Sequence, residues 1–271
     1  MVIAYTIALP CQSEMDRTRM KSFRILLFAA LVLAGGTGLA LADEIRVAVA
    51  SNFADAIKAA ADVFEEKTGH RVILIFGSTG KHFAQIRNGA PFEAFFAADA
   101  RRPALLEAEG VARPGSRFTY AVGKVVLWSP DPDFIDAGAD VLVEGGFRHL
   151  AMANPKLAPY GKAAEEVMRR KGVWDDLQTR TVRGENIGQA FQFVKSGNAE
   201  LGFVALSQIT QPGKAIAGSL WRPPQALYTP IEQQAVLLRE NPAARQFLAF
   251  MQDDAAVKII ESYGYDVPDQ P

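Results

Sequence analysis

The chain has 271 residues and a formal charge of −1, and hydrophobic residues make up 49% of it. This composition is ample for a packed core and excludes an intrinsically disordered chain. Acidic and basic residues are interspersed, so the sequence offers neither a basic field for nucleic acid nor a polybasic arm for a membrane surface.

The first 42 residues are expected to be a signal peptide. From Met20 a basic start leads into the apolar run 25–34, and small residues then match a cleavage site after Ala42. We interpret residues 1–19 as either an upstream start-site artefact or a long basic region. The apolar run is too short to span a bilayer comfortably, and nothing later in the chain is long enough. The sequence therefore predicts an exported, periplasmic protein with no membrane insertion after cleavage.

Strand and helix patterns alternate after the signal peptide. The predicted strands are 45–50, 71–76 and 92–98, and the predicted helices that follow them are 54–67, 81–88 and 103–109. This alternation is typical of parallel βαβ units. Because ligands in such sheets bind at the carboxyl ends of strands, the residues that follow the strands are candidate binding residues.

A second set of elements follows Tyr120. Its predicted strands are 124–129, 150–153, 179–183 and 201–205, and its predicted helices are 161–171 and 187–196. After a proline-rich stretch come a strand at 234–238, a helix capped by Asn241 and a helix at 255–263. The sequence thus predicts an α/β protein with two lobes. Lobe I comprises 43–122 and 230–271, lobe II comprises 123–229, and hinge motion at the crossings closes them around a ligand.

Small hydroxyl residues stand where two successive strands end and helices begin. Ser51 is followed by Asn52, and Ser78 by Thr79. Such residues are ordinary helix caps. A serine there also offers its hydroxyl and unpaired backbone N–H groups at the positive end of the helix dipole, which suits an anion. The two roles are compatible, and the pair favours an anion site.

The second lobe contains two further strand-to-helix junctions. Tyr160 lies at one of them and Ile187 at the other, so their backbone N–H groups could face the same ligand from the opposite side. The hydroxyl of Tyr160 is a further possible donor, whereas only the main chain of Ile187 is expected to bind. Glu185 lies near this site in sequence, and its side chain is expected to point outward or to cap the helix.

Several other residues are assigned ordinary structural roles. The only cysteine, Cys11, lies inside the signal peptide, so the mature chain would have no disulfide, thiolate metal site or cysteine nucleophile. His70, His82 and His149 have no ligand spacing, and surface positions are expected for them. Tyr263 and Tyr265 flank the glycine that ends the last helix and are expected to pack there.

Four segments together resemble the periplasmic molybdate-binding proteins of ABC transporters. They are Ala50-Ser51-Asn52, Gly77-Ser78-Thr79-Gly80, the stretch from Asn88-Gly89-Ala90-Pro91 to Ala98-Asp99, and Tyr263-Gly264-Tyr265. The resemblance covers essentially all of the mature chain. It implies the type II periplasmic binding protein fold, in which each lobe is a central sheet flanked by helices and a dehydrated tetrahedral oxyanion lies in the cleft between the lobes.

The resemblance also implies which residues bind the anion. The contacts would come from Ser51, Ser78, Tyr160 and the main chain at Ile187, with Asn52 beside them. In many relatives a tyrosine reaches the anion from the position of Ala205, and here Tyr160 is expected to supply that hydroxyl. Molybdenum would be held only as the oxyanion, with no direct bond from protein to metal and no other cofactor.

A site of neutral N–H and O–H donors suits molybdate, tungstate and sulfate, which carry no proton at neutral pH, whereas phosphate keeps one that needs an acceptor. The leading hypothesis is a monomeric binding protein that delivers molybdate or tungstate to a membrane permease driven by an ATPase. Sulfate or another oxyanion remains an alternative ligand, and a receptor-linked sensor an alternative role. A serine hydrolase is disfavoured, because neither serine lies in a nucleophile elbow and no histidine is paired with one.

Overall fold

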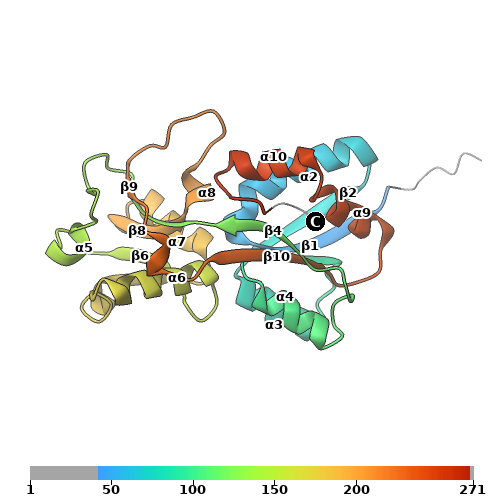
Figure 1. Ribbon diagram of the computed structural model, residues 1–271, viewed down its shortest axis with the longest axis horizontal. Coiled ribbons are helices and arrows are strands. Elements are labelled where there is room, and N and C mark those ends of the chain that lie inside the picture. The colour runs from blue at the N-terminus through green and yellow to red at the C-terminus, as the bar shows by residue number, and fades with distance from the viewer. Residues whose placement is uncertain (1–41, 269–271) are drawn as a thin grey trace, which may run out of the picture. The chain divides into compact units, whose positions relative to one another are not determined.

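Two five-stranded sheets organise residues 42–268, the part of the chain that the computed structural model describes (Figure 1). The signal peptide expected over residues 1–42, including Cys11, lies outside the described residues except for Ala42. Within 42–268, no helix is both long enough and apolar enough to cross a membrane.

The first sheet has the strand order β2 (Arg71–Gly77), β1 (Glu44–Ala50), β3 (Ala94–Ala97), β10 (Ile231–Leu237) and β4 (Phe118–Gly123). Strand β1 pairs in parallel with β2 and β3, whereas β10 is antiparallel to both β3 and β4. Its helices are α2 (Ala54–Thr68), α3 (Thr79–Arg87), α4 (Arg101–Ala108), α9 (Pro242–Phe250) and α10 (Asp254–Ser262), with the 3-10 turn η1 (Ser51–Phe53) between β1 and α2. We call this sheet with its helices lobe I.

The second sheet has the order β7 (Thr181–Gly184), β6 (Leu150–Ala153), β8 (Leu201–Ala205), β5 (Val125–Ser129) and β9 (Ser219–Trp221). Its helices are α5 (Val141–Glu144), α6 (Pro159–Arg170), α7 (Ile187–Lys195) and α8 (Leu206–Ile209), and the 3-10 turns are η2 (Gln178–Arg180) and η3 (Gln225–Leu227). Strand β6 is parallel to β7 and β8, whereas β5 is antiparallel to β8 and β9. This sheet with its helices is lobe II, and the predicted two-lobed α/β architecture is confirmed.

The parallel βαβ arrangement predicted for the first three strands is confirmed, but both sheets also contain antiparallel strands. Strands β5 and β10 enter their sheets antiparallel, and β4 and β9 are strands that the pattern did not predict. The reason is the chain path: β4 leads out of lobe I into β5, and β10 brings the chain back beside it. Figure 1 shows β4 and β10 side by side where the chain passes between the two sheets.

Aromatic packing holds the carboxyl end of β1 in place. Phe53, in η1, is fully buried against Tyr120 of β4 and Phe96 of β3, with ring centroids 4.5 and 6.1 Å away. Burying one such ring stabilises the fold by roughly 1.5–3 kcal/mol. The residues just before Phe53, Ser51 and Asn52, are therefore held on a rigid support.

Candidate functional site

A small cavity lies where the carboxyl ends of β1, β2 and β3 face the N-termini of α6 and α7. Its volume is about 10 Å³. The lining residues are Ala50, Ser51, Asn52, Gly77, Ser78, Thr79, Ala98, Ala158, Pro159, Tyr160, Asn186 and Ile187. All the site residues predicted from the sequence therefore lie together here except Ala205, which is buried at the start of α8 and does not line the cavity.

Ser78 is both the N-cap of α3 and a wall of the cavity. Its side chain is buried, and its Oγ accepts a hydrogen bond from the backbone N–H of Lys81 at 3.3 Å. Thr79 is used differently, since its Oγ1 accepts from the N–H of Ala98 at 3.0 Å. The cap occupies a lone pair of Ser78 and leaves the hydroxyl proton free to donate.

Ser51 connects the first sheet with the start of α7 in lobe II. Its Oγ donates to Asn186 Oδ1 at 3.1 Å and accepts from the N–H of Gly188 at 3.1 Å. Asn186 is the N-cap of α7 and also accepts from the N–H of Gln189 at 3.0 Å. The N–H groups of Gly188 and Gln189, in the first turn of α7, therefore both have side-chain acceptors. The N–H of Ile187, in the same turn, has no hydrogen-bond acceptor within the described chain.

Helix α6 begins at the cavity without a side-chain cap. Ala158 occupies the N-cap position and Pro159 the first helical position, so neither supplies a capping oxygen or a first N–H. The N–H groups of Tyr160 and Gly161 have no acceptor among residues 42–268. An uncapped helix start that faces a cavity offers backbone donors and the positive end of a helix dipole to a bound anion.

Tyr160 lies almost entirely inside the protein. Burial raises its pKa well above the ordinary value for tyrosine, so the hydroxyl keeps its proton at physiological pH. The Oη accepts a hydrogen bond from Gln233 Nε2 at 3.1 Å. The hydroxyl of Tyr160 is also hydrogen-bonded to that of Tyr265, so it belongs to a buried polar network beside the cavity.

Among residues 42–268, no charged side chain lines this cavity. The carboxylate of Glu185 pairs instead with Lys81 Nζ at 3.1 Å, and both side chains are more than one-third exposed. The polar groups around the cavity are hydroxyls, amides and backbone N–H groups. Such a set favours a ligand that is rich in acceptors and carries no proton of its own.

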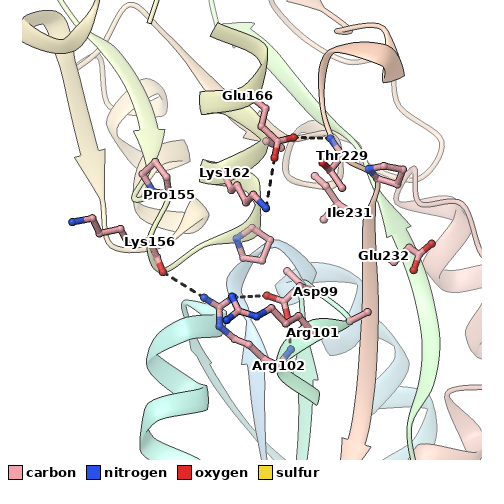
Figure 2. Close-up of a pocket in the computed structure, with 15 residues that line it drawn as sticks. Asp99, Arg101, Arg102, Pro155, Lys156, Lys162, Glu166, Thr229, Ile231 and Glu232 are labelled. Atoms are coloured by element: carbon pink, nitrogen blue, oxygen red, sulfur yellow. Dashed lines mark hydrogen bonds and ion pairs between the residues drawn. The ribbon is translucent and has the colours of Figure 1, made fainter. Parts of the chain in front are cut away.

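A larger, charged groove adjoins the cavity (Figure 2). The two share Ala98 and Pro159 in their walls. Within the groove Arg102 pairs with Asp99, and Lys162 lies 3.7 Å from Glu166, whose carboxylate also accepts from the N–H of Thr229. The groove also contains Arg101, Lys156 and the carboxylate of Glu232, none of which makes an ion pair within the described chain. This leaves a single positive charge in excess beside the cavity, which favours the approach of an anion only weakly.

The structure corrects the expectation for His82, which is not on the surface. The ring is buried against Phe92 and Phe95, with centroids 5.8 and 6.2 Å away. Burial lowers its pKa, and Nε2 has no hydrogen-bond partner among the described residues. No cluster of three or more metal-ligating side chains occurs within residues 42–268.

Three residues that the sequence analysis did not assign to the site form its support. All three are buried: Gln233 is hydrogen-bonded to both Asn52 and Tyr160, Tyr265 is hydrogen-bonded to Asn52, and Tyr120 is hydrogen-bonded to Gln233. The sequence pattern predicted only a packing role for Tyr265. The available signal was a pair of glutamines, Gln233 and Gln234, just before the apolar end of β10, because an amide that becomes buried in a sheet needs hydrogen-bond partners.

Two α/β lobes around a small interlobe cavity define a solute-binding protein with the type II periplasmic binding protein fold. The chain belongs to the family described as bacterial extracellular solute-binding protein, whose sequence profile matches residues 45–266. It is 50% identical to the molybdate-binding protein ModA of Azotobacter vinelandii, over 87% of this chain and 96% of that protein. Identity to the molybdate-binding protein ModA of Rhodobacter capsulatus is 48%, over 88% of this chain and 98% of that protein.

The fold also matches a solved structure closely. The periplasmic molybdate-binding protein of Azotobacter vinelandii superposes with a TM-score of 0.81 at 45% sequence identity. The match covers 83% of this chain and the whole of that one. The similarity therefore extends through both lobes.

Proposed function

We propose that this protein binds molybdate or tungstate in the periplasm and delivers it to an ABC importer. The observation that carries the proposal is the cavity itself, which is small, lacks charged side chains and is lined by neutral donors from both lobes. At about 10 Å³ it is far smaller than the pockets that hold drug-sized molecules, so an ion of a few atoms is the fitting ligand. The two relatives named molybdate-binding protein support the same ligand.

The donors that would hold the anion come from opposite sides. Ser51 and Ser78 supply hydroxyls from lobe I, with Asn52 beside them, while Tyr160 and the N–H of Ile187 act from lobe II. The proton of Ser51, which now goes to Asn186, would turn to the anion, because hydrogen bonds to a charged acceptor are stronger than those to a neutral amide. Ala205 is not included among these donors, since it does not line the cavity.

Closure of the lobes would exclude water from the anion. We propose lobe I as 43–122 and 230–271 and lobe II as 123–229, with hinges at the two crossings. The lobes touch through the N–H of Gly80, which donates to Leu157 O at 2.8 Å, and through the Ser51 contacts with α7. The permease would recognise this closed form, and the binding protein would act as a monomer without catalysis or a cofactor.

Calorimetric titration of the protein expressed from Asp43 tests the proposal. Molybdate and tungstate are expected to bind tightly, sulfate more weakly and phosphate not detectably, because phosphate carries a proton that finds no carboxylate acceptor in the cavity. Tight phosphate binding without molybdate binding would contradict the proposal. An affinity for sulfate equal to that for molybdate would indicate a general oxyanion-binding protein instead.

A further inference from the structure

Two glycines occupy equivalent positions in helices that begin at the cavity. Gly80 is the second residue of α3 in lobe I, and Gly188 is the second residue of α7 in lobe II. Neither has the positive φ that favours glycine. Because glycine is a poorer helix former than alanine, its presence at both positions needs an explanation other than backbone conformation.

The backbone N–H of each glycine donates to the opposite lobe. Gly80 donates to the backbone oxygen of Leu157 at 2.8 Å, and Gly188 donates to Ser51 Oγ at 3.1 Å. Among residues 42–268, neither N–H has an acceptor in its own lobe. The arrangement is reciprocal, since each lobe supplies one donor and one acceptor, and both hydrogen bonds require the lobes to be in contact.

The two helices divide the N–H groups of their first three residues in the same way. In each, the N-cap side chain accepts from the third residue and the opposite lobe accepts from the glycine. The first N–H, that of Thr79 in α3 and of Ile187 in α7, has no acceptor within the described chain. Both of these residues line the cavity. The contact between the lobes is thus one residue away from the free donor of each helix.

Space explains why these two positions are glycine. A Cβ on Gly80 would lie 2.9 Å from the backbone oxygen of Leu157 and 3.1 Å from its Cα. A Cβ on Gly188 would lie 3.3 Å from the Cβ of Ser51 and 3.0 Å from Asn186 Oδ1. A methyl group at position 80 would therefore press on the main chain of the opposite lobe, and one at position 188 would do so more mildly.

Leu157 cannot retreat from such a methyl group by itself, because it belongs to a tight turn. The backbone oxygen of Asn154 accepts from the N–H of Leu157 at 3.1 Å and from that of Ala158 at 2.9 Å. Ala158 lines the cavity together with Pro159, which begins α6. A displacement of Leu157 away from Gly80 would therefore move a wall of the cavity as well.

We infer that Gly80 and Gly188 are positioning residues for oxyanion binding, which determine how closely the two lobes approach each other around the anion. The inference rests on the proposed function. It assigns neither glycine a contact with the ligand, since neither lines the cavity. Because each hydrogen bond needs both lobes, the two bonds form and break together as the lobes close and open. A substitution at one glycine therefore weakens the bond made by the other.

Amide hydrogen exchange, measured by NMR with and without molybdate, tests this coupling. The N–H groups of both glycines are bonded only to the opposite lobe, so their exchange reports separation of the lobes. In Gly80→Ala the amide of Gly188, in the other lobe, is expected to exchange about tenfold faster than in the wild type. Molybdate is expected to slow the exchange of both amides in the wild-type protein.

Gly172→Ala is the matched control. Gly172 follows the far end of α6 with a φ of 75°, and a Cβ there would meet nothing within 4 Å. Alanine at this position strains the backbone and lowers stability without touching the opposite lobe. This variant should leave the exchange of the Gly188 amide and the affinity for molybdate unchanged.

Calorimetric titration measures the effect of the same variants on the ligand. Gly80→Ala is expected to weaken molybdate binding about three- to tenfold, as the loss of one hydrogen bond would. If helix propensity alone mattered, this variant would be more stable than the wild type and would bind molybdate equally well. Thermal unfolding of each variant establishes that the protein tested is folded.

Gly188→Ala provides the reciprocal test and covers the case in which Gly80→Ala does not fold. It is expected to speed the exchange of the Gly80 amide, by a smaller factor because the contacts of its Cβ are less close. Exchange of the Gly80 amide at the wild-type rate in this variant would contradict the coupling between the two bonds.

Two further results would overturn the inference. One is an unchanged exchange rate of the Gly188 amide in Gly80→Ala. The other is an equal change in Gly172→Ala, which would mean that exchange reports general stability rather than contact between the lobes. Failure of the wild-type protein to bind molybdate would refute the proposed function instead. Exchange without molybdate still tests the contact in that case, so the two failures are distinguishable.

Discussion

Ser78 has two separable roles, and substitution by alanine should reveal both. In the folded protein its Oγ caps α3 by accepting from the N–H of Lys81, and its proton is available to an anion in the cavity. Loss of the cap is expected to lower the free energy of unfolding by about 0.5–2 kcal/mol, toward the lower end because the capping bond is long. Loss of a donor to a charged ligand should weaken binding by about 1.5–3 kcal/mol, or about 10- to 150-fold.

A matched control separates the two losses. Asn241 caps α9 in the same way, accepting from the N–H of Ala244 at 2.9 Å, and it does not line the cavity. Asn241→Ala should therefore reduce stability to urea by a similar amount and leave molybdate affinity unchanged. Urea unfolding and calorimetric titration of both variants provide the comparison. Wild-type affinity in Ser78→Ala, or equal weakening in both variants, would refute the assignment of Ser78 as a ligand donor.

Three further substitutions test other parts of the account. Gly123→Ala should weaken molybdate binding, because its Cβ displaces the hydroxyl of Tyr160; a calorimetric affinity equal to that of the wild type would contradict this. Lys81→Met removes the exposed ion pair with Glu185. It should weaken molybdate binding, measured by calorimetry, by at most about 1 kcal/mol, and by less at high salt. A loss of affinity as large as that of Ser78→Ala would indicate that Lys81 contacts the ligand. Burial lowers the pKa of His82 below its ordinary value of 6.5, so around and below that pH the unfolded chain binds more protons than the folded one and stability falls as the pH drops. Urea unfolding of His82→Gln between pH 5 and 7 should show a smaller pH dependence than that of the wild type, and an unchanged pH dependence would contradict this.

Local sequence patterns were sufficient to predict the positions of four residues that line the cavity. Ser51 and Ser78 follow apolar strands and precede helices, and Ile187 opens a helix, so each could be placed at a strand end or helix start from its neighbours alone. Tyr160 could be placed in the same way, at the start of α6. The rule that ligands bind at the carboxyl ends of strands then predicted that these residues would meet.

The residues behind the cavity could not be predicted in this way. Gln233 lies 181 positions from Asn52, and Tyr265 lies 213 positions from it, yet both are hydrogen-bonded to it. No local pattern records which distant partner satisfies a buried amide. His82 shows the same limit, because only the folded chain reveals that Phe92 and Phe95 cover its ring. Strand direction also depended on the return path of β10, which periodicity does not encode.

A crystal structure of the molybdate complex, with anomalous scattering used to locate molybdenum, would show directly which groups hold the anion. One anomalous peak is expected in the cavity between Ser78 and Tyr160, with hydroxyl and backbone N–H donors around the anion and no lysine or arginine in contact. A peak in the charged groove of Figure 2, bound by Arg101 or Lys156, would contradict the claim that neutral donors hold the ligand.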